Sequence, residues 1–205
     1  MFPKYMGLIL FFLAGAFAAP ADEARLPRVA ANPAPLPAQR TAVPEIPHAM
    51  KPPQKVGVCE ADASGVDYCA SSVLPGSKTN HYEPSMLFDG NPATAWVEGV
   101  SEDGIGETIT LHFDRQRPLL GFEIINGYGK NQKIWSANSR VETLEASTGD
   151  GQIQVITLKD LQAQSRFDFD APVETSWLQL KINSVCGGSK YRDTAISELY
   201  PIFAD

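Results

Sequence analysis

Short runs of alternating apolar and polar residues, separated by turn-forming residues, constrain the fold of this chain more than any other feature. Residues 177–185 (WLQLKINSV) and 107–113 (ETITLHF) both alternate. A period of two places every second side chain on the same face of a strand, so each run predicts a strand with one buried face. Residues 148–151 (TGDG) have the composition of a hairpin turn. The chain is therefore expected to be rich in antiparallel strands.

Further short runs extend this pattern along the chain. They cover residues 119–125, 141–147, 152–158, 165–169 and 195–203. A helical turn is predicted only for residues 84–88 (PSMLF), where Pro84 stands near the start. About seven short strands with no helical repeats between them are typical of a β-sandwich and not of a parallel α/β sheet. The expected fold class is all-β.

The beginning of the chain has the composition of a secretion signal. Lys4 provides a positive charge, residues 6–13 (MGLILFFL) are apolar, and residues 16–18 (AFA) place small side chains where signal peptidase reads them. The apolar run is shorter than the roughly 20 residues that cross a bilayer, which disfavours a retained membrane anchor. We expect residues 1–19 to be a cleaved signal peptide. The mature protein is then exported, periplasmic or secreted, without an integral membrane segment.

Residues 20–55 are rich in Pro and Ala. Proline fixes φ and removes a backbone donor, which blocks both helix and sheet. This stretch predicts an extended, disordered linker, or a leader without a role of its own. The folded domain is expected to cover residues 56–205.

Three cysteines, Cys59, Cys69 and Cys186, allow one disulfide in an exported protein. A Cys59–Cys69 bridge closes a short local loop, whereas a Cys69–Cys186 bridge ties the first strand to a late segment. The spacing favours Cys59–Cys69 but does not decide between them.

Charge and motif content disfavour several function classes. The formal net charge is −7, and no cluster of Lys and Arg offers a surface for nucleic acid. The three histidines are scattered and no CxxC pair is present, which argues against zinc. Glu102 and Asp103 are adjacent acids beside a glycine, typical of a solvated turn, and no serine or cysteine nucleophile has a histidine at a recognisable spacing. We therefore expect no enzymatic activity.

An ordered set of motifs resembles a known family. The set begins with residues 70–72 (ASS) and 87–96 (LFDGNPATAW), and its later members are residues 104–107, 126–128, 138–140 and 190–198. Together they resemble discoidin, or coagulation-factor type C, domains of the galactose-binding-like jelly-roll class. The bacterial glycan-binding subgroup named for the translocation domain of a secreted NAD glycohydrolase is the most similar. The resemblance implies a jelly-roll β-sandwich. The chain carries Ala195 where many relatives have cysteine, and no catalytic domain is attached, so NAD cleavage is not carried over.

The turn at residues 89–96 has two readings. Asp89, Asn91 and Thr94 can aim several oxygens at one point, which suits calcium, and the resemblance implies that Glu198 lies beside this turn to complete the site. Alternatively, Asp89 and Asn91 satisfy the amides of their own turn. Trp96, next to the turn, is expected to fill the core.

Polar loop residues are the candidates for sugar binding. Asn, Asp, Glu and Arg side chains offer planar hydrogen-bonding groups, and an aromatic ring can stack on a sugar. Lys130 belongs to the same set of loops. The predicted ligand-binding residues are Glu98, Asn126, Tyr128, Trp135, Asn138, Arg140, Lys190 and Asp193.

These side chains also have structural alternatives. They can cross-link the loops by hydrogen bonds and salt bridges. Arg140 can equally pair with Glu98 or Asp193 and shape the site without touching the ligand, and Trp135 either provides a sugar platform or is buried against a neighbouring loop. The predicted function is an exported, non-enzymatic glycan-binding module, with binding to a protein partner in the cell envelope as the alternative.

Overall fold

The computed structural model of the chain describes residues 50–204. The predicted signal peptide and most of the predicted linker lie outside these residues. The secondary-structure elements are β1 (Val58–Ala61), β2 (Val66–Ala70), the 3-10 helix η1 (Pro84–Leu87), β3 (Trp96–Val97), β4 (Thr108–Asn126), α1 (Gln132–Ala137), β5 (Arg140–Thr148), β6 (Ile153–Thr157), β7 (Gln164–Cys186) and β8 (Ala195–Phe203). No helix within residues 50–204 is long and apolar enough to cross a membrane.

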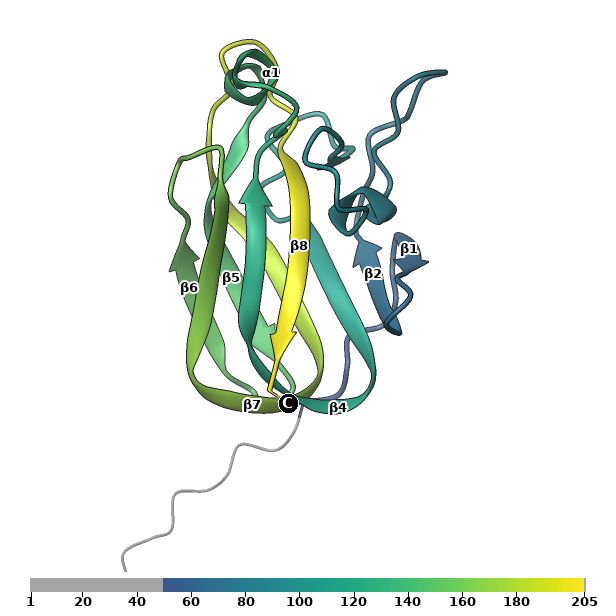
Figure 1. The fold of residues 1–205 in the computed structure, drawn as a ribbon, viewed down its shortest axis with the longest axis vertical. Coiled ribbons are helices and arrows are strands. Elements are labelled where there is room, and N and C mark those ends of the chain that lie inside the picture. Colours follow the sequence, from purple (N-terminus) through teal and green to yellow (C-terminus); the bar gives the residue numbers. More distant parts are fainter. Residues whose placement is uncertain (1–49, 205) are drawn as a thin grey trace, which may run out of the picture. The chain divides into compact units, whose positions relative to one another are not determined.

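Two long, bent strands build both layers of a β-sandwich. β4 and β7 pair antiparallel from Thr108↔Lys181 to Ile125↔Gln164, with a register shift between His112 and Arg117. The chain bends at this shift, so each strand passes from one layer to the other at the end opposite α1 (Figure 1). One layer has the order β1-β2-β4-β7-β5-β6, and the other joins the remaining parts of β7 and β4 to β8 and β3. This arrangement confirms the predicted all-β sandwich.

The core lies between the layers and follows the alternation of the sequence. Leu178, Leu180 and Ile182 are buried, as their alternate positions predict. They join Phe122 and other side chains of the opposite layer in one hydrophobic cluster. Trp96 is fully buried in the same cluster, and its indole nitrogen donates to the carbonyl of Ser72 at 3.0 Å. The core role expected for Trp96 is confirmed.

The structure differs from the sequence-based elements mainly at the bend. The runs predicted at 107–113 and 119–125 belong to one strand, and those at 165–169 and 177–185 belong to another. Residues between them, such as Asp114 and Pro118, have turn-like composition but remain extended around the bulge. Helix α1 and the short strands β1 and β3 were not predicted, while the first strand expected at Cys69 is β2. α1 begins after Asn131, whose side chain accepts a hydrogen bond from the backbone of Ile134.

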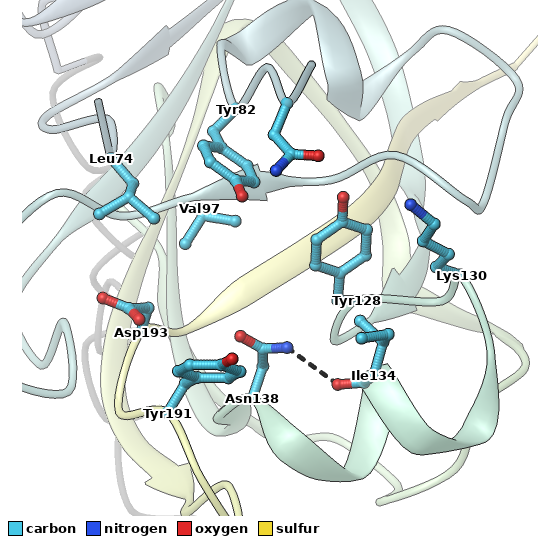
Figure 2. Close-up of a pocket in the computed structure, with 10 residues that line it drawn as sticks. Leu74, Tyr82, Val97, Tyr128, Lys130, Ile134, Asn138, Tyr191 and Asp193 are labelled. Atoms are coloured by element: carbon cyan, nitrogen blue, oxygen red, sulfur yellow. Dashed lines mark hydrogen bonds between the residues drawn. The ribbon is translucent and has the colours of Figure 1, made fainter. Parts of the chain in front are cut away.

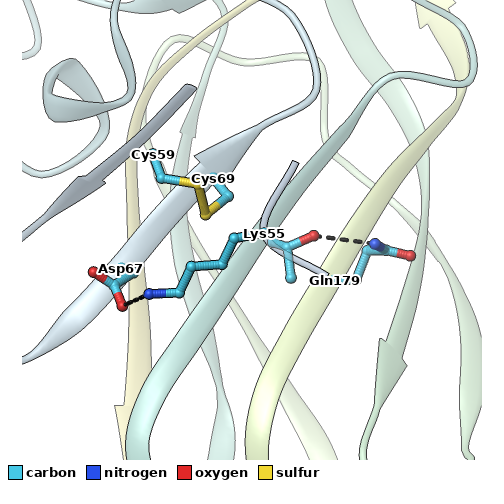
Figure 3. Close-up of a disulfide and its surroundings, with 6 residues drawn as sticks. Lys55, Cys59, Asp67, Cys69 and Gln179 are labelled. Atoms are coloured by element: carbon cyan, nitrogen blue, oxygen red, sulfur yellow. Dashed lines mark hydrogen bonds and ion pairs between the residues drawn. A yellow bond between two sulfur atoms is a disulfide. The ribbon is translucent and has the colours of Figure 1, made fainter. Parts of the chain in front are cut away.

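The disulfide joins Cys59 and Cys69, which face each other in the β1–β2 pair (Figure 3). This confirms the favoured pairing and leaves Cys186 as a free cysteine. The residues just before β1 also contact the sandwich. Lys55 pairs with Asp67 at 2.5 Å, and the backbone of Met50 donates to Gly149 at 2.7 Å. This part of the predicted linker is thus attached to the folded domain.

Replacing both bridged cysteines by serine should destabilise the domain. The bridge closes a loop with a sequence separation of 10, and loops of this size contribute about 2–3 kcal/mol by limiting the unfolded chain. We expect the double variant to lose about that much free energy of unfolding in urea denaturation. Cys186→Ser is the matched control, and an equal loss in that variant would contradict the assignment.

Candidate functional site

An open pocket of about 370 Å³ lies at the end of the sandwich that carries α1 (Figure 2). Three tyrosine side chains, Tyr82, Tyr128 and Tyr191, contribute to its wall. The other lining residues are polar or aliphatic. They are Leu74, Asn80, Val97, Lys130, Ile134, Asn138 and Asp193. The pocket therefore combines aromatic surface with amide and charged groups.

The floor of the pocket is a small hydrophobic cluster separate from the main core. It consists of Ala95, Val97 and Ala195, held together where β3 pairs with β8. Tyr82 and Tyr128 pack against this cluster and meet edge to face, with ring centroids 6.4 Å apart. Burial raises the pKa of both phenols, so both are neutral donors at physiological pH.

Gly127 positions Tyr128 at the end of β4. Its φ is +85°, a conformation that favours glycine, and its backbone nitrogen donates to Ala195 at 3.0 Å. A Cβ atom here would lie 2.7 Å from Arg140 Cγ and 2.8 Å from the Trp135 ring. The backbone therefore lies directly against these two side chains, and only glycine fits.

Arg140 holds α1 against the sandwich. Its guanidinium lies 4.2 Å from the centroid of the Trp135 ring and donates to the carbonyls of Trp135 and Asn138 at 3.3 and 3.0 Å. It also pairs with both carboxylate oxygens of Asp160, at 2.7 and 3.1 Å. The alternative pairing of Arg140 with Glu98 or Asp193 does not form, because its guanidinium is bound to Asp160 and to these two carbonyls.

Asn126 and Trp135 belong to the same supporting layer. The Asn126 amide exchanges two hydrogen bonds with the backbone of Val141, at 2.7 and 3.0 Å. Trp135 is only 8% exposed, and its indole nitrogen donates to the carbonyl of Asn126 at 2.9 Å. Arg140 covers the ring of Trp135. Trp135 is therefore buried, as the second of its two predicted roles had it, and does not offer a platform for a sugar.

Glu98 lies fully buried behind the pocket. Its two oxygens accept hydrogen bonds from the backbone nitrogens of Val100 and Thr194, at 2.7 and 3.1 Å. Burial raises the pKa of this carboxyl, and the charge of Asp193 adds to the effect. Gly104 leaves room for it, since a Cβ there would lie 2.5 Å from Glu98 Cγ. Glu98 therefore joins two loops instead of reaching a ligand.

The loop before β8 brings further predicted residues to the pocket. Asp193 lines the pocket, whereas the Lys190 ammonium lies 4.7 Å from the centroid of the Tyr191 ring, outside the lining set. The next residue, Arg192, turns outward and pairs with Glu102 and Asp103 at 2.8 and 2.5 Å. Thr194 anchors the end of the loop by donating to the carbonyl of Asp103.

The predicted site residues thus divide into two sets. Tyr128, Asn138 and Asp193 line the pocket, while the other five support it or lie outside it. Sequence reasoning missed Tyr82 and Tyr191. Tyr191 stands inside the 190–198 motif and could have been found there, but Tyr82 lies in a loop with no pattern to mark it.

A second hollow of about 250 Å³ adjoins the pocket. It shares Asn80, Tyr128 and Lys130 with the pocket and reaches the turn that contains Asp89 and Thr94. The Ser197 hydroxyl links the two regions. It accepts from the backbone of Gly129 at 2.8 Å and donates to the carbonyl of Pro92 at 3.1 Å.

The turn at residues 89–94 satisfies many of its own polar groups. Asp89 accepts from the Asn91 nitrogen at 2.8 Å and from the Thr94 hydroxyl at 2.7 Å. The Asn91 amide oxygen accepts from the backbone of Ala93 at 3.2 Å. These are the contacts that the self-satisfied reading of the turn predicts.

Glu198 nonetheless leaves an acceptor free beside this turn. It is buried in β8, and its Oε2 accepts from the Tyr200 hydroxyl at 2.5 Å. Oε1 is buried without a hydrogen-bond partner among residues 50–204. Burial raises the pKa of Glu198, and the nearby charge of Asp89 raises it further, while the Tyr200 hydroxyl and the nearby backbone nitrogens of Gly90 and Asn91 lower it. The carboxylates of Asp89 and Glu198, the second with a free oxygen, fit a hard cation. No group of three or more His, Cys, Asp or Glu side chains gathers within the described chain, so carbonyl oxygens would have to complete such a site.

Solved structures with this fold include several carbohydrate-active proteins. A CBM32 module from Clostridium perfringens, in complex with GalNAc-β-1,3-galactose, has a TM-score of 0.52 at 19% identity over 68% of this chain and 96% of its own. The arabinofuranosyltransferase AftD from Mycobacteria has a TM-score of 0.53 at 20% identity over 69% of this chain and 10% of its own. A mutant Ruminococcus gnavus GH29 fucosidase, in complex with fucose, has a TM-score of 0.51 at 17% identity over 70% of this chain and 26% of its own.

The chain and these solved structures share the same β-sandwich fold, which defines the class of the domain. The particular family follows from the sequence. The model of the NAD glycohydrolase translocation F5/8 type C domain matches residues 62–201, and the chain belongs to this family. No curated protein matches the chain.

The ion pair that fixes α1 should make stability depend on pH. Arg140 lowers the pKa of Asp160 through hydrogen bonds and charge. A lowered pKa in the folded state contributes stability above the ordinary carboxyl pKa, and this contribution is lost as the pH falls through the lowered value. We expect Asp160→Asn to melt below the wild type at neutral pH, with the difference shrinking in acid. Asp170→Asn, at an exposed acid with no ion pair among the described residues, is the control; a pH-independent difference for Asp160→Asn would contradict the pair.

Proposed function

We propose that this protein is a non-enzymatic carbohydrate-binding module that holds a glycan in the tyrosine-lined pocket. The observation that carries the proposal is the convergence of Tyr82, Tyr128 and Tyr191 with the Asn138 amide and the Asp193 carboxylate. Aromatic rings stack on the apolar faces of sugars, and planar polar groups form hydrogen bonds with their hydroxyls. The Clostridium perfringens module of the same fold was solved with a disaccharide, which supports this assignment.

The acids of the pocket favour binding over hydrolysis. Glycoside hydrolysis in most enzymes uses two carboxyl groups that flank the scissile bond. Among residues 50–204, Asp193 is the one acid that lines the larger pocket, and Glu98 lies behind the wall with its oxygens used by backbone amides. The pocket therefore offers recognition groups without an acid–base pair.

Export of the protein is part of the proposal. The Cys59–Cys69 disulfide forms and persists in oxidising compartments such as the periplasm or the cell exterior. Glycans of the cell surface and of the surroundings are found in those compartments, which suits a binding module.

Removing one pocket ring tests the proposal. Tyr191 is 41% exposed and belongs to neither hydrophobic cluster, so Tyr191→Ala should leave the fold intact. Stacking on an aromatic ring is worth about 0.5–1.5 kcal/mol, so we expect binding to glycans on an array to weaken about threefold to tenfold. Isothermal titration with the best array ligand measures the loss.

Two further variants complete this test. Tyr128→Phe keeps the ring and removes one hydroxyl, which separates stacking from hydrogen bonding. Val155→Ser changes an exposed apolar residue on the edge strand β6, outside the pocket, and should leave binding unchanged. A blank array for the wild type, or equal binding by all of these proteins, would remove the pocket as a glycan site.

We also propose a structural calcium ion beside Glu198. It would be held by Asp89, Asn91, Thr94 and Glu198 together with backbone carbonyls of the turn. The support is the buried, unpartnered Oε1 of Glu198 next to Asp89, since a cation would remove both the unmet acceptor and the repulsion between the two acids. Ser197 connects this turn to the loop of Tyr128, so the ion would also stiffen the pocket.

Calcium should then raise the melting temperature of the protein and a chelator should lower it. Glu198→Gln is expected to abolish the response, because the neutral amide has half the acceptor capacity and no charge. Glu123→Gln, at a half-buried acid on the neighbouring strand β4, is the matched control. A wild-type melting curve that is the same with calcium and with chelator would contradict the site.

A further inference from the structure

The charges around the pocket are uneven, and one end is acidic. Asp193 lines this end, and the fully buried Glu98 lies behind it, joined by its hydrogen bond to the nitrogen of Thr194, the residue after Asp193. Neither carboxylate has an ion pair among residues 50–204. Asp193 therefore presents a negative charge at this end of the pocket that no ion pair within residues 50–204 neutralises.

None of the basic residues near the pocket forms an ion pair with Asp193 in the described part of the chain. Arg192 is held outward by Glu102 and Asp103. Lys190 lies against the ring of Tyr191. Lys130 lines the opposite side of the pocket from Asp193, as Figure 2 shows. A cation can therefore reach Asp193 without displacing an internal partner.

Aromatic rings complete an environment that suits an organic cation. Tyr82 and Tyr191 line the pocket together with Asp193, and the Lys190 ammonium already lies 4.7 Å from the centroid of the Tyr191 ring. Ring faces attract ammonium groups, most strongly where water is partly excluded. The charge of Asp193 also reaches Tyr82, since it contributes to the raised pKa of that phenol after burial.

We propose that the pocket prefers a glycan with a free amino group, a de-N-acetylated amino sugar whose ammonium pairs with Asp193. This inference rests on the proposed glycan-binding function and specifies its ligand. The sugar ring lies among the tyrosines, and the ammonium donates to the carboxylate at the acidic end. The net charge of −7 adds a long-range attraction for polycationic glycans.

Matched sugars test the preference. Glucosamine and galactosamine are each immobilised through the anomeric carbon, once as the free amine and once as the N-acetyl form. The two forms of each sugar then differ only at the amino group. A charge-assisted hydrogen bond is worth about 1.5–3 kcal/mol, so the amine forms should bind about tenfold or more tightly at low salt. Added salt should reduce this preference.

Asp193→Asn should bring amine and N-acetyl forms to similar affinity. The Asp193 side chain makes no hydrogen bond within the described chain, so the nearly isosteric amide should fold normally, which thermal melting checks. Asp114→Asn changes the total charge equally, at the bend of β4 far from α1, and should keep the preference.

Other outcomes separate this inference from the proposed function. Equal binding of amine and N-acetyl forms by the wild type overturns the amine preference and leaves glycan binding in place. A preference that survives Asp193→Asn overturns the role of this carboxylate. If calcium chloride alone binds in an Asp193-dependent way, the carboxylate serves a metal and the inference fails. Absence of binding to every sugar overturns both proposals.

Discussion

The pairing of β4 with β7, which continues from one layer into the other, is the constraint on which the rest of the structure depends. Because both strands bend at the same register shift, the two layers are fixed to each other by backbone hydrogen bonds as well as by the core. The opposite end of the sandwich then gathers the chain segments that leave or enter strands. Tyr128 follows β4, Asn138 precedes β5 and Asp193 precedes β8. The pocket is a consequence of this arrangement, since residues far apart in sequence meet where strands end together.

Behind the pocket, buried polar side chains form the hydrogen bonds to backbone groups that neighbouring strands form elsewhere in the sandwich. Arg140 satisfies carbonyls at the end of α1, Asn126 satisfies the backbone of Val141, and Glu98 satisfies amides of two loops. Each of these groups is costly to bury alone and is stabilising only because its partners are in place. This explains why some polar residues of the motifs, such as Arg140 and Asn126, lie around the pocket without lining it. They satisfy backbone groups at the ends of strands and in the loops that connect them.

The sequence predicted the parts of the fold that depend on periodicity, and it predicted less where periodicity is absent. Alternation located the long strands and the buried face of residues 177–185, and the spacing of Cys59 and Cys69 favoured the disulfide that forms. The bend was missed because residues such as Pro118 look the same in a turn and in a bulged strand. Within the loops, residue type alone could not separate Tyr128, which lines the pocket, from Trp135, which supports it. Both are aromatic residues in polar segments, and only three-dimensional packing distinguishes them.

The supporting network also determines the electrostatics of the site. Glu98 is retained behind the wall because the amides of Val100 and Thr194 need an acceptor, and a carboxylate supplies two at once. Glu98 lies buried close behind Asp193, whose charge adds to burial in raising the pKa of Glu98, while Arg192 is paired with the outer acids Glu102 and Asp103. A neutral sugar would leave this acidic end without a counter-charge, and an acidic sugar would be repelled there. A ligand that carries an ammonium group supplies the missing positive charge at the acidic end. The acids are held there by the hydrogen-bonding needs of the loop backbone.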